Sequence, residues 1–254
     1  MAADTPIDAQ GIATLAIQGR KALNIVGTPE ITALTAQIHA LGADPRLRVL
    51  VLRGQDARAF IGGADIHEMA TLTTATAPAF ITRLKDLCEA VRQCPVPVVA
   101  QIEGWCLGGG LEVALACDLR LGSSASSYGM PEVKVGIPSV IHAALLPRRV
   151  GPAAASWLLL TGETIGADEA HRLGLLHELH APGALAAAVQ ARAAQLAGLG
   201  TQVLRQQKRM LRDWERQTVD DSIARSVTEF GRAFATGEPQ RYMQAFIDRP
   251  RVGR

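Results

Sequence analysis

Two glycine-rich turns are the part of this sequence best suited to hold a reacting carbonyl group. Gly62-Gly63 lies in the segment Ala59–Ile66, and Gly108-Gly109-Gly110 lies in the segment Gly104–Glu112. Both turns stand between an expected strand and an expected helix, where the backbone can approach a ligand and helix N–H groups lack partners. One N–H from each turn, aimed at the same oxygen, would form an oxyanion hole for a thioester or ester carbonyl.

Other glycine motifs fit these turns poorly. No Lys-Ser/Thr pair follows the second turn, so it is not a P-loop, and its consecutive glycines differ from the dinucleotide fingerprint. The sequence also lacks a G-x-S-x-G nucleophile elbow. The oxyanion-hole interpretation therefore has no competitor among the common phosphate-binding and hydrolase motifs.

Two glutamates follow the turns. Glu112 comes two residues after Gly110 in an otherwise apolar helical pattern, and Glu132 lies in the turn-like segment Tyr128–Val133. Each alone is better explained as a helix-terminal or loop carboxylate. Together they could act as a general acid/base pair on a water and a substrate carbon. The sequence leaves open whether the two side chains converge.

The elements that must position these residues change character along the chain. Apolar runs predict strands over residues 11–17, 49–53, 96–102 and 119–121, the second of them buried on both faces. Apolar residues at helical spacing predict helices over residues 29–41, 78–92 and 107–117, then 153–160, 167–173, 185–197, 203–214, 221–235 and 240–248. We therefore expect an α/β core over residues 1–195 and a helical C-terminal region over residues 196–254.

Composition narrows the class of protein. The chain has 254 residues, 48% of them hydrophobic and 4% aromatic, with a formal net charge of +2. These values exclude intrinsic disorder and give no reason to expect nucleic acid as a partner. Four cysteines without a CxxC pair predict small buried residues in a reducing compartment. Residues 1–10 do not resemble a signal peptide and no apolar run is long enough to span a bilayer, so a cytoplasmic protein without a membrane partner is expected.

Several motifs, in one order along nearly the whole chain, resemble the crotonase superfamily and most of all its enoyl-CoA hydratases. They are Lys21–Asn24, Gly62–Ile66, Pro95–Ala100, Gly108–Glu112, Cys117-Asp118, Met130–Glu132, Thr161–Ile165 and Phe234–Phe246. The resemblance implies a crotonase-like spiral of ββα units with a helical C-terminal trimerisation region. It also implies a homotrimer or a dimer of trimers.

The same resemblance implies a hydro-lyase of fatty acid metabolism that adds water across the α,β double bond of a 2-enoyl-CoA thioester to give 3-hydroxyacyl-CoA. By analogy, Glu112 activates the water, Glu132 exchanges the proton at the α-carbon, and the N–H groups of Gly62 and Gly109 hold the thioester oxygen. The implied substrate and CoA site consists of Lys21, Ala22, Gly62, Gly63, Ala64, Asp65, Ile66 and Gly109. Neither a metal nor a cofactor is expected, because coenzyme A is part of the substrate.

The chain departs from the family pattern in two places. Where many members have a glycine-rich IPGAGG-type stretch, this chain has bulky residues over Ile137–Leu146, which makes Ile137, Ile141 and His142 a possible acyl pocket. For His142, a place in the first turn of a helix is the favoured interpretation. Tyr242 stands where a glycine is usual, and we expect it to pack. Acyl chain length, branching and pathway are not specified by the sequence.

Two other functions stay open. An isomerase, or another enolate-stabilising crotonase reaction, can run with one carboxylate. A non-catalytic acyl-CoA- or RNA-binding scaffold is supported only by the filled segment Ser139–Leu146. The basic stretch Arg205–Arg212 is interpreted as a solvated helix face because no aromatic platform accompanies it, and Asp118 as a brace for the following strand.

Overall fold

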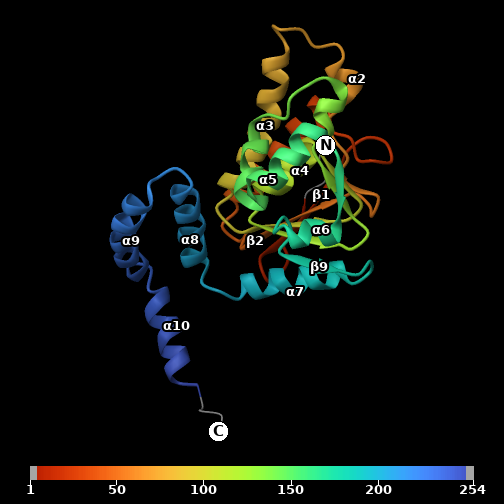
Figure 1. Cartoon of the computed structure of the whole chain (residues 1–254). Coiled ribbons are helices and arrows are strands. Elements are labelled where there is room, and N and C mark those ends of the chain that lie inside the picture. The colour runs from red at the N-terminus through yellow and green to blue at the C-terminus, as the bar shows by residue number, and fades with distance from the viewer. Residues whose placement is uncertain (1–4, 250–254) are drawn as a thin grey trace.

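The larger of two sheets forms the centre of the molecule in a computed structural model that describes residues 5–249 (Figure 1). Its five strands are all parallel, in the order β1-β2-β4-β6-β9. They are β1 (Ile12–Ile17), β2 (Val49–Gly54), β4 (Val98–Ile102), β6 (Leu119–Ser123) and β9 (Glu178–His180). In β2, Val49 to Leu52 are all buried, which confirms the predicted burial on both faces.

Helices cover both faces of this sheet. On one face, Val49 and Val51 pack in a cluster with Leu185 and Val189 of α7 (Leu185–Ala197). On the other face, Leu50 and Leu52 belong to the main core, to which α1 (Thr28–Ala43) and α3 (Ala77–Gln93) contribute their apolar stripes. Alternate residues of one apolar strand thus join two separate cores, as expected where a parallel sheet is covered on both sides.

A smaller sheet, which the sequence patterns did not predict, runs beside the first. Its strands β3 (Ala59–Ile61), β5 (Trp105–Leu107) and β7 (Ser127–Gly129) are parallel, and β8 (Thr164–Gly166) joins antiparallel to β7. Each of β2, β4 and β6 is followed by one of these short strands and then by a helical segment. The expected succession of ββα units is therefore present. Because β5 occupies Trp105–Leu107, helix α4 (Gly109–Ala116) starts later than predicted.

Helices dominate after residue 145. They are α5 (Leu146–Thr161), α6 (Ala167–Arg172), α7, α8 (Thr201–Trp214), α9 (Val219–Phe234) and α10 (Glu238–Ile247). The last two, α9 and α10, extend away from the sheets (Figure 1). The division at residue 195 remains a prediction, and residues 1–4 and 250–254 of the two predicted parts lie outside the described residues.

Ion pairs to Asp118 fasten α8 to the sheet core. The Asp118 carboxylate pairs with Lys208 Nζ and with Arg212 Nη2, each at 2.7 Å, and it accepts the Val98 N–H at 2.8 Å. Lys208 and Arg212 are only 6% and 8% exposed. The interpretation of Arg205–Arg212 as a solvated face is therefore wrong for these two residues. Asp118 has a bracing role, but it holds β4 and α8 rather than the strand that follows it.

The four cysteines are free and buried, as expected. Burial raises the pKa of the Cys117 thiol to about 12, which keeps it protonated and unreactive. Among the described residues, no helix is long and apolar enough to cross a membrane.

Candidate active site

The two glycine turns lie side by side because the short strands before them are paired. β3 and β5 are parallel neighbours, so their carboxyl ends meet at one edge of the smaller sheet. A side chain at Gly110 would collide with the carbonyl oxygen of Ile61, so glycine is required for this close approach. The turns therefore follow the short strands rather than the long strands from which we predicted them to emerge.

The available N–H donors differ from those expected. The Gly62 N–H donates to the carbonyl oxygen of Leu23 at 2.8 Å, so the prediction that it serves an oxyanion is wrong in this structure. The Val26 N–H donates to the Gly63 carbonyl oxygen, and the Val26 carbonyl oxygen accepts the Asp65 N–H. The N–H of Ala64, between these two groups, is therefore directed to the other side of the turn. Within residues 5–249 no acceptor is present for the N–H groups of Gly63, Ala64 and Gly109.

The loop Lys21–Asn24 is fastened to the first turn. Asn24 is buried, its Nδ2 donates to the Phe60 carbonyl at 2.6 Å, and its Oδ1 accepts the Gly19 N–H at 2.6 Å. Lys21 and Asn24 have φ angles of 56° and 52°, in the left-handed region that asparagine tolerates. Lys21 and Ala22 are thereby exposed beside the turn. Asn24, the last residue of the Lys21–Asn24 motif, thus holds this loop in place.

Asp65 and Ile66 complete the predicted coenzyme A segment. The Asp65 carboxylate accepts the His67 N–H at 2.9 Å, which caps α2 (Ile66–Met69), and it pairs with Arg20 Nη1 at 3.2 Å. Ile66 is 55% exposed. Asp65 thus supports the turn, while Ile66 presents an apolar side chain at the surface next to it.

Glu112 lies in the first turn of α4 and is buried, with only 3% of its surface exposed. Its Oε1 accepts the Ala143 N–H at 2.9 Å. Burial raises the Glu112 pKa to about 8, against the opposing effect of the Ala143 hydrogen bond, and the charge of Glu132 raises it further. This carboxyl is therefore held largely protonated at neutral pH.

Glu132 reaches the same place from a different element. It lies half-buried in the 3-10 helix η1 (Pro131–Val135), and its Oε2 accepts the Ser139 hydroxyl at 2.8 Å. Its Oε1 lies so close to Gly108, the residue before α4, that a side chain at Gly108 would collide with it. The two glutamates therefore converge at the second glycine turn, a point that the sequence left open.

The predicted acyl-pocket residues lie in or near the segment Ser139–Ala143, which hydrogen-bonds to both glutamates. Ile141 and His142 begin the 3-10 helix η2 (Ile141–Leu145), and Ile137 is 39% exposed. His142 is buried, its Nε2 lies 2.9 Å from Glu89 Oε1 on α3, and burial lowers its pKa. The interpretation of His142 as a histidine in the first turn of a helix is confirmed. Contact of these residues with an acyl chain remains a prediction.

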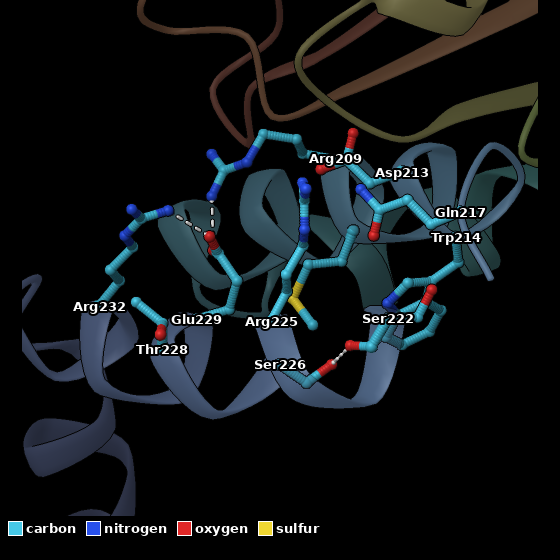
Figure 2. A pocket seen from close by; sticks show the side chains of 11 residues that line it. Arg209, Asp213, Trp214, Gln217, Ser222, Arg225, Ser226, Thr228, Glu229 and Arg232 are labelled. Atoms are coloured by element: carbon cyan, nitrogen blue, oxygen red, sulfur yellow. Dashed lines mark hydrogen bonds and ion pairs between the residues drawn. The ribbon is translucent and has the colours of Figure 1, made fainter. Parts of the chain in front are cut away.

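Tyr242 lies on α10, where its hydroxyl donates to the Gly198 carbonyl at 3.3 Å. This contact joins α10 to the turn between α7 and α8, as expected for a packing residue. A groove of about 370 Å³ opens between α8 and α9 (Figure 2). Arg209 and Arg232 pair with Glu229 in this groove. None of the predicted site residues lines it.

Comparison with known proteins gives the family. The family model described as enoyl-CoA hydratase/isomerase matches residues 8–252. The chain belongs to the enoyl-CoA hydratase/isomerase family. It is 31% identical over 239 residues to a crotonyl-CoA hydratase of Syntrophomonas wolfei, covering 94% of this chain and 92% of that one. It is 29% identical over 242 residues to a short-chain-enoyl-CoA hydratase of Clostridium acetobutylicum, covering 95% and 93%.

A solved structure has the same fold. The structure of an enoyl-CoA hydratase from Mycobacterium smegmatis superposes with a TM-score of 0.92 at 24% identity, covering 96% of this chain and 95% of that one. The predicted crotonase-like α/β fold with a helical C-terminal region is confirmed.

Proposed function

We propose that this member of the family is an enoyl-CoA hydratase. The observation that carries the proposal is the convergence of Glu112 and Glu132 beside the free N–H of Gly109. Among the described residues, the hydrogen bond to Glu132 is made at Oε2 alone, so its Oε1 is left for water or substrate. The two relatives named as hydratases, which match more than nine-tenths of the chain, support the same activity.

In the proposed reaction, the thioester oxygen accepts one hydrogen bond from the Gly109 N–H and another from the N–H of Ala64 or Gly63. The pair of glutamates carries one proton, because burial and mutual repulsion oppose two charges there. The ionised carboxylate takes a proton from water, the water oxygen bonds to the β-carbon, and the protonated carboxyl delivers its proton to the α-carbon. The pair again holds one proton at the end. Family analogy assigns water to Glu112 and the α-carbon to Glu132. The shared proton, which burial favours on Glu112 in the free protein, therefore has to move to Glu132 before the water adds.

The rest of the proposed site serves binding. The exposed loop with Lys21 and Ala22 and the turn from Gly63 to Ile66 border the two glycine turns, where they would hold the coenzyme A part of the substrate. The lysine supplies a cation for a phosphate group. The reaction as proposed needs no metal and no further cofactor.

We also propose that the chain forms a homotrimer or a dimer of trimers through its last helices. Ile223, Val227 and Phe230 of α9 are 63%, 76% and 71% exposed, and Phe246 and Ile247 of α10 are each 71% exposed. Large apolar side chains gathered on protruding helices are typical of a surface that is covered in the assembled protein.

Incubation with crotonyl-CoA, followed by mass spectrometry of the product, tests the hydratase proposal. We expect the thioester to gain the mass of one water. A product of unchanged mass but altered double-bond position, from longer enoyl-CoA esters, would support isomerisation instead. Thermal stabilisation by coenzyme A esters without any turnover would favour the binding scaffold.

A further inference from the structure

One short segment contacts both glutamates. The Ser139 hydroxyl donates to Glu132 Oε2 at 2.8 Å, and the Ala143 N–H donates to Glu112 Oε1 at 2.9 Å. Glu112 is held by the backbone, whose donor does not depend on the side chain at position 143. Glu132 is held by a side chain, so the identity of residue 139 decides whether this hydrogen bond exists.

The conformation of the segment fixes the spacing between its two contacts. Ile141, between them, has a φ angle of 41°, a left-handed conformation that is unfavourable for a β-branched residue. Its neighbours enforce this conformation, since His142 is bonded to Glu89 on α3 and the Ile141 side chain packs against the main core. A segment held in this way presents Ser139 in a defined position.

The hydrogen bond from Ser139 distinguishes the two oxygens of Glu132. Oε2 accepts the Ser139 hydroxyl, whereas Oε1 lies against Gly108 in the second glycine turn. The next residue in that turn, Gly109, has an N–H without an acceptor among the described residues. Within the described part of the chain, Ser139 is the only side chain or backbone group that donates to the Glu132 carboxylate. Without it, the half-buried side chain of Glu132 would be free to rotate away from the turn.

We propose that Ser139 is a positioning residue for Glu132, holding Oε2 so that Oε1 faces the α-carbon of the bound acyl-CoA. The proposal rests on the proposed function, because it takes Glu132 as the group that exchanges the α-proton. Ser139 itself would touch neither the water nor the substrate carbon. Its effect should therefore appear in kcat rather than in KM.

Two assays on the same variants test this role. The first is hydration of crotonyl-CoA. The second is exchange of the α-hydrogens of butyryl-CoA in D2O, which needs the oxyanion hole and the α-carbon base but no double bond. We expect Ser139→Ala to lower kcat and the exchange rate by about ten- to hundredfold with little change in KM, the size expected for one hydrogen bond to a charged group. The variant Ser139→Thr keeps the hydroxyl and should therefore retain most of the wild-type value of both rates.

Two further variants give the proposal its controls. Ser124→Ala removes an exposed serine in the turn after β6 and should leave both rates unchanged. In a Glu132→Gln background, Ser139→Ala should cause no further loss, because the group that it positions has already been disabled. Melting temperatures of all variants would exclude misfolding as the cause of a loss.

The outcomes separate this inference from the proposed function. Wild-type rates in Ser139→Ala, or an equal loss with and without Glu132, would overturn the positioning role. A wild-type protein that exchanges α-hydrogens but does not hydrate crotonyl-CoA would contradict the hydratase proposal, while the exchange rates would still decide the role of Ser139. A wild-type protein that does neither would overturn both.

Discussion

The Glu112 carboxyl is surrounded by apolar residues of α4, and this position governs how it titrates. The helix from Gly109 to Ala116 is buried at every residue. Its one acidic side chain accepts the backbone N–H of Ala143 and loses most of its contact with water. Loss of hydration disfavours the charged form, so the pKa rises toward the pH range in which a carboxyl can deliver a proton.

A pH profile follows from this burial. Because the pKa of Glu112 is raised to about 8, the pair loses its proton as the pH rises through that value. The proposed reaction needs that proton, so kcat/KM for crotonyl-CoA should fall above about pH 8, since this ratio reports the free protein. Steady-state rates from neutral to alkaline pH check the prediction. A profile that stays flat through this range would contradict it.

Gly108 allows a second test at the scale of one residue. It has a φ angle of 53°, and a side chain there would collide with Glu132 Oε1. Gly108→Ala should therefore strain the turn and displace the carboxylate, lowering kcat about ten- to hundredfold. Gly166→Ala is the matched control, because Gly166 also precedes a helix, has ordinary φ, and has open space around it. Similar kinetics in the two variants would count against the placement of Glu132.

At the scale of elements, the long apolar patterns were informative and the short strands were not. The helices α1, α3 and α7 and the strand β2 were predicted to within a few residues, because each has a regular apolar period or a continuous apolar run. The strands β3, β5, β7, β8 and β9 have three residues each. Three residues are too few to display a period, so the sheet from which both glycine turns emerge could not be predicted.

Contacts between distant segments explain the remaining differences. The place of Gly62 in a motif predicts that its N–H is an oxyanion donor, but this N–H donates to the carbonyl oxygen of Leu23. That contact depends on how two loops pair, which the local sequence does not show. The role of Ser139 could not be predicted, because a serine after a proline gives no local sign of contact with a carboxylate seven residues earlier in the chain. Glu112, Glu132 and the second glycine turn were found because their residue types and order carry the chemistry directly.

The anchoring of α8 gives a prediction at this scale. Asp118→Asn would leave the buried Lys208 without its counter-charge and Arg212 with Glu215 alone, which should lower the free energy of unfolding by about 3–5 kcal/mol. Urea unfolding measures the change. Glu169→Gln removes the partner of Arg172 in an exposed pair and should leave the unfolding midpoint nearly unchanged. Equal effects of the two substitutions would show that burial of the Asp118 pairs is not what matters.

At the scale of the whole molecule, α9 and α10 stand apart from the sheets (Figure 1). Both helices expose large apolar side chains. Phe230→Asp would place a charge on the proposed subunit interface. We expect it to convert a trimer or hexamer into smaller species, because a buried charge without a partner opposes association. Sedimentation velocity reports the change.

Leu160→Asp is the control for this surface. Leu160 lies on α5 and is 79% exposed, so it tests whether any exposed apolar residue would have the same effect. The assembly should survive this substitution. Dissociation by Leu160→Asp with no effect of Phe230→Asp would place the interface elsewhere.

The proposed hydration depends most on the pair of glutamates, and conservative substitution tests their role most directly. Glu112→Gln and Glu132→Gln keep the shape of each side chain while removing its ability to transfer a proton. Each should lower kcat for crotonyl-CoA hydration by at least about a hundredfold, the scale of general acid/base catalysis, with binding of a saturated acyl-CoA largely retained. Full hydration activity in both variants would contradict the central claim.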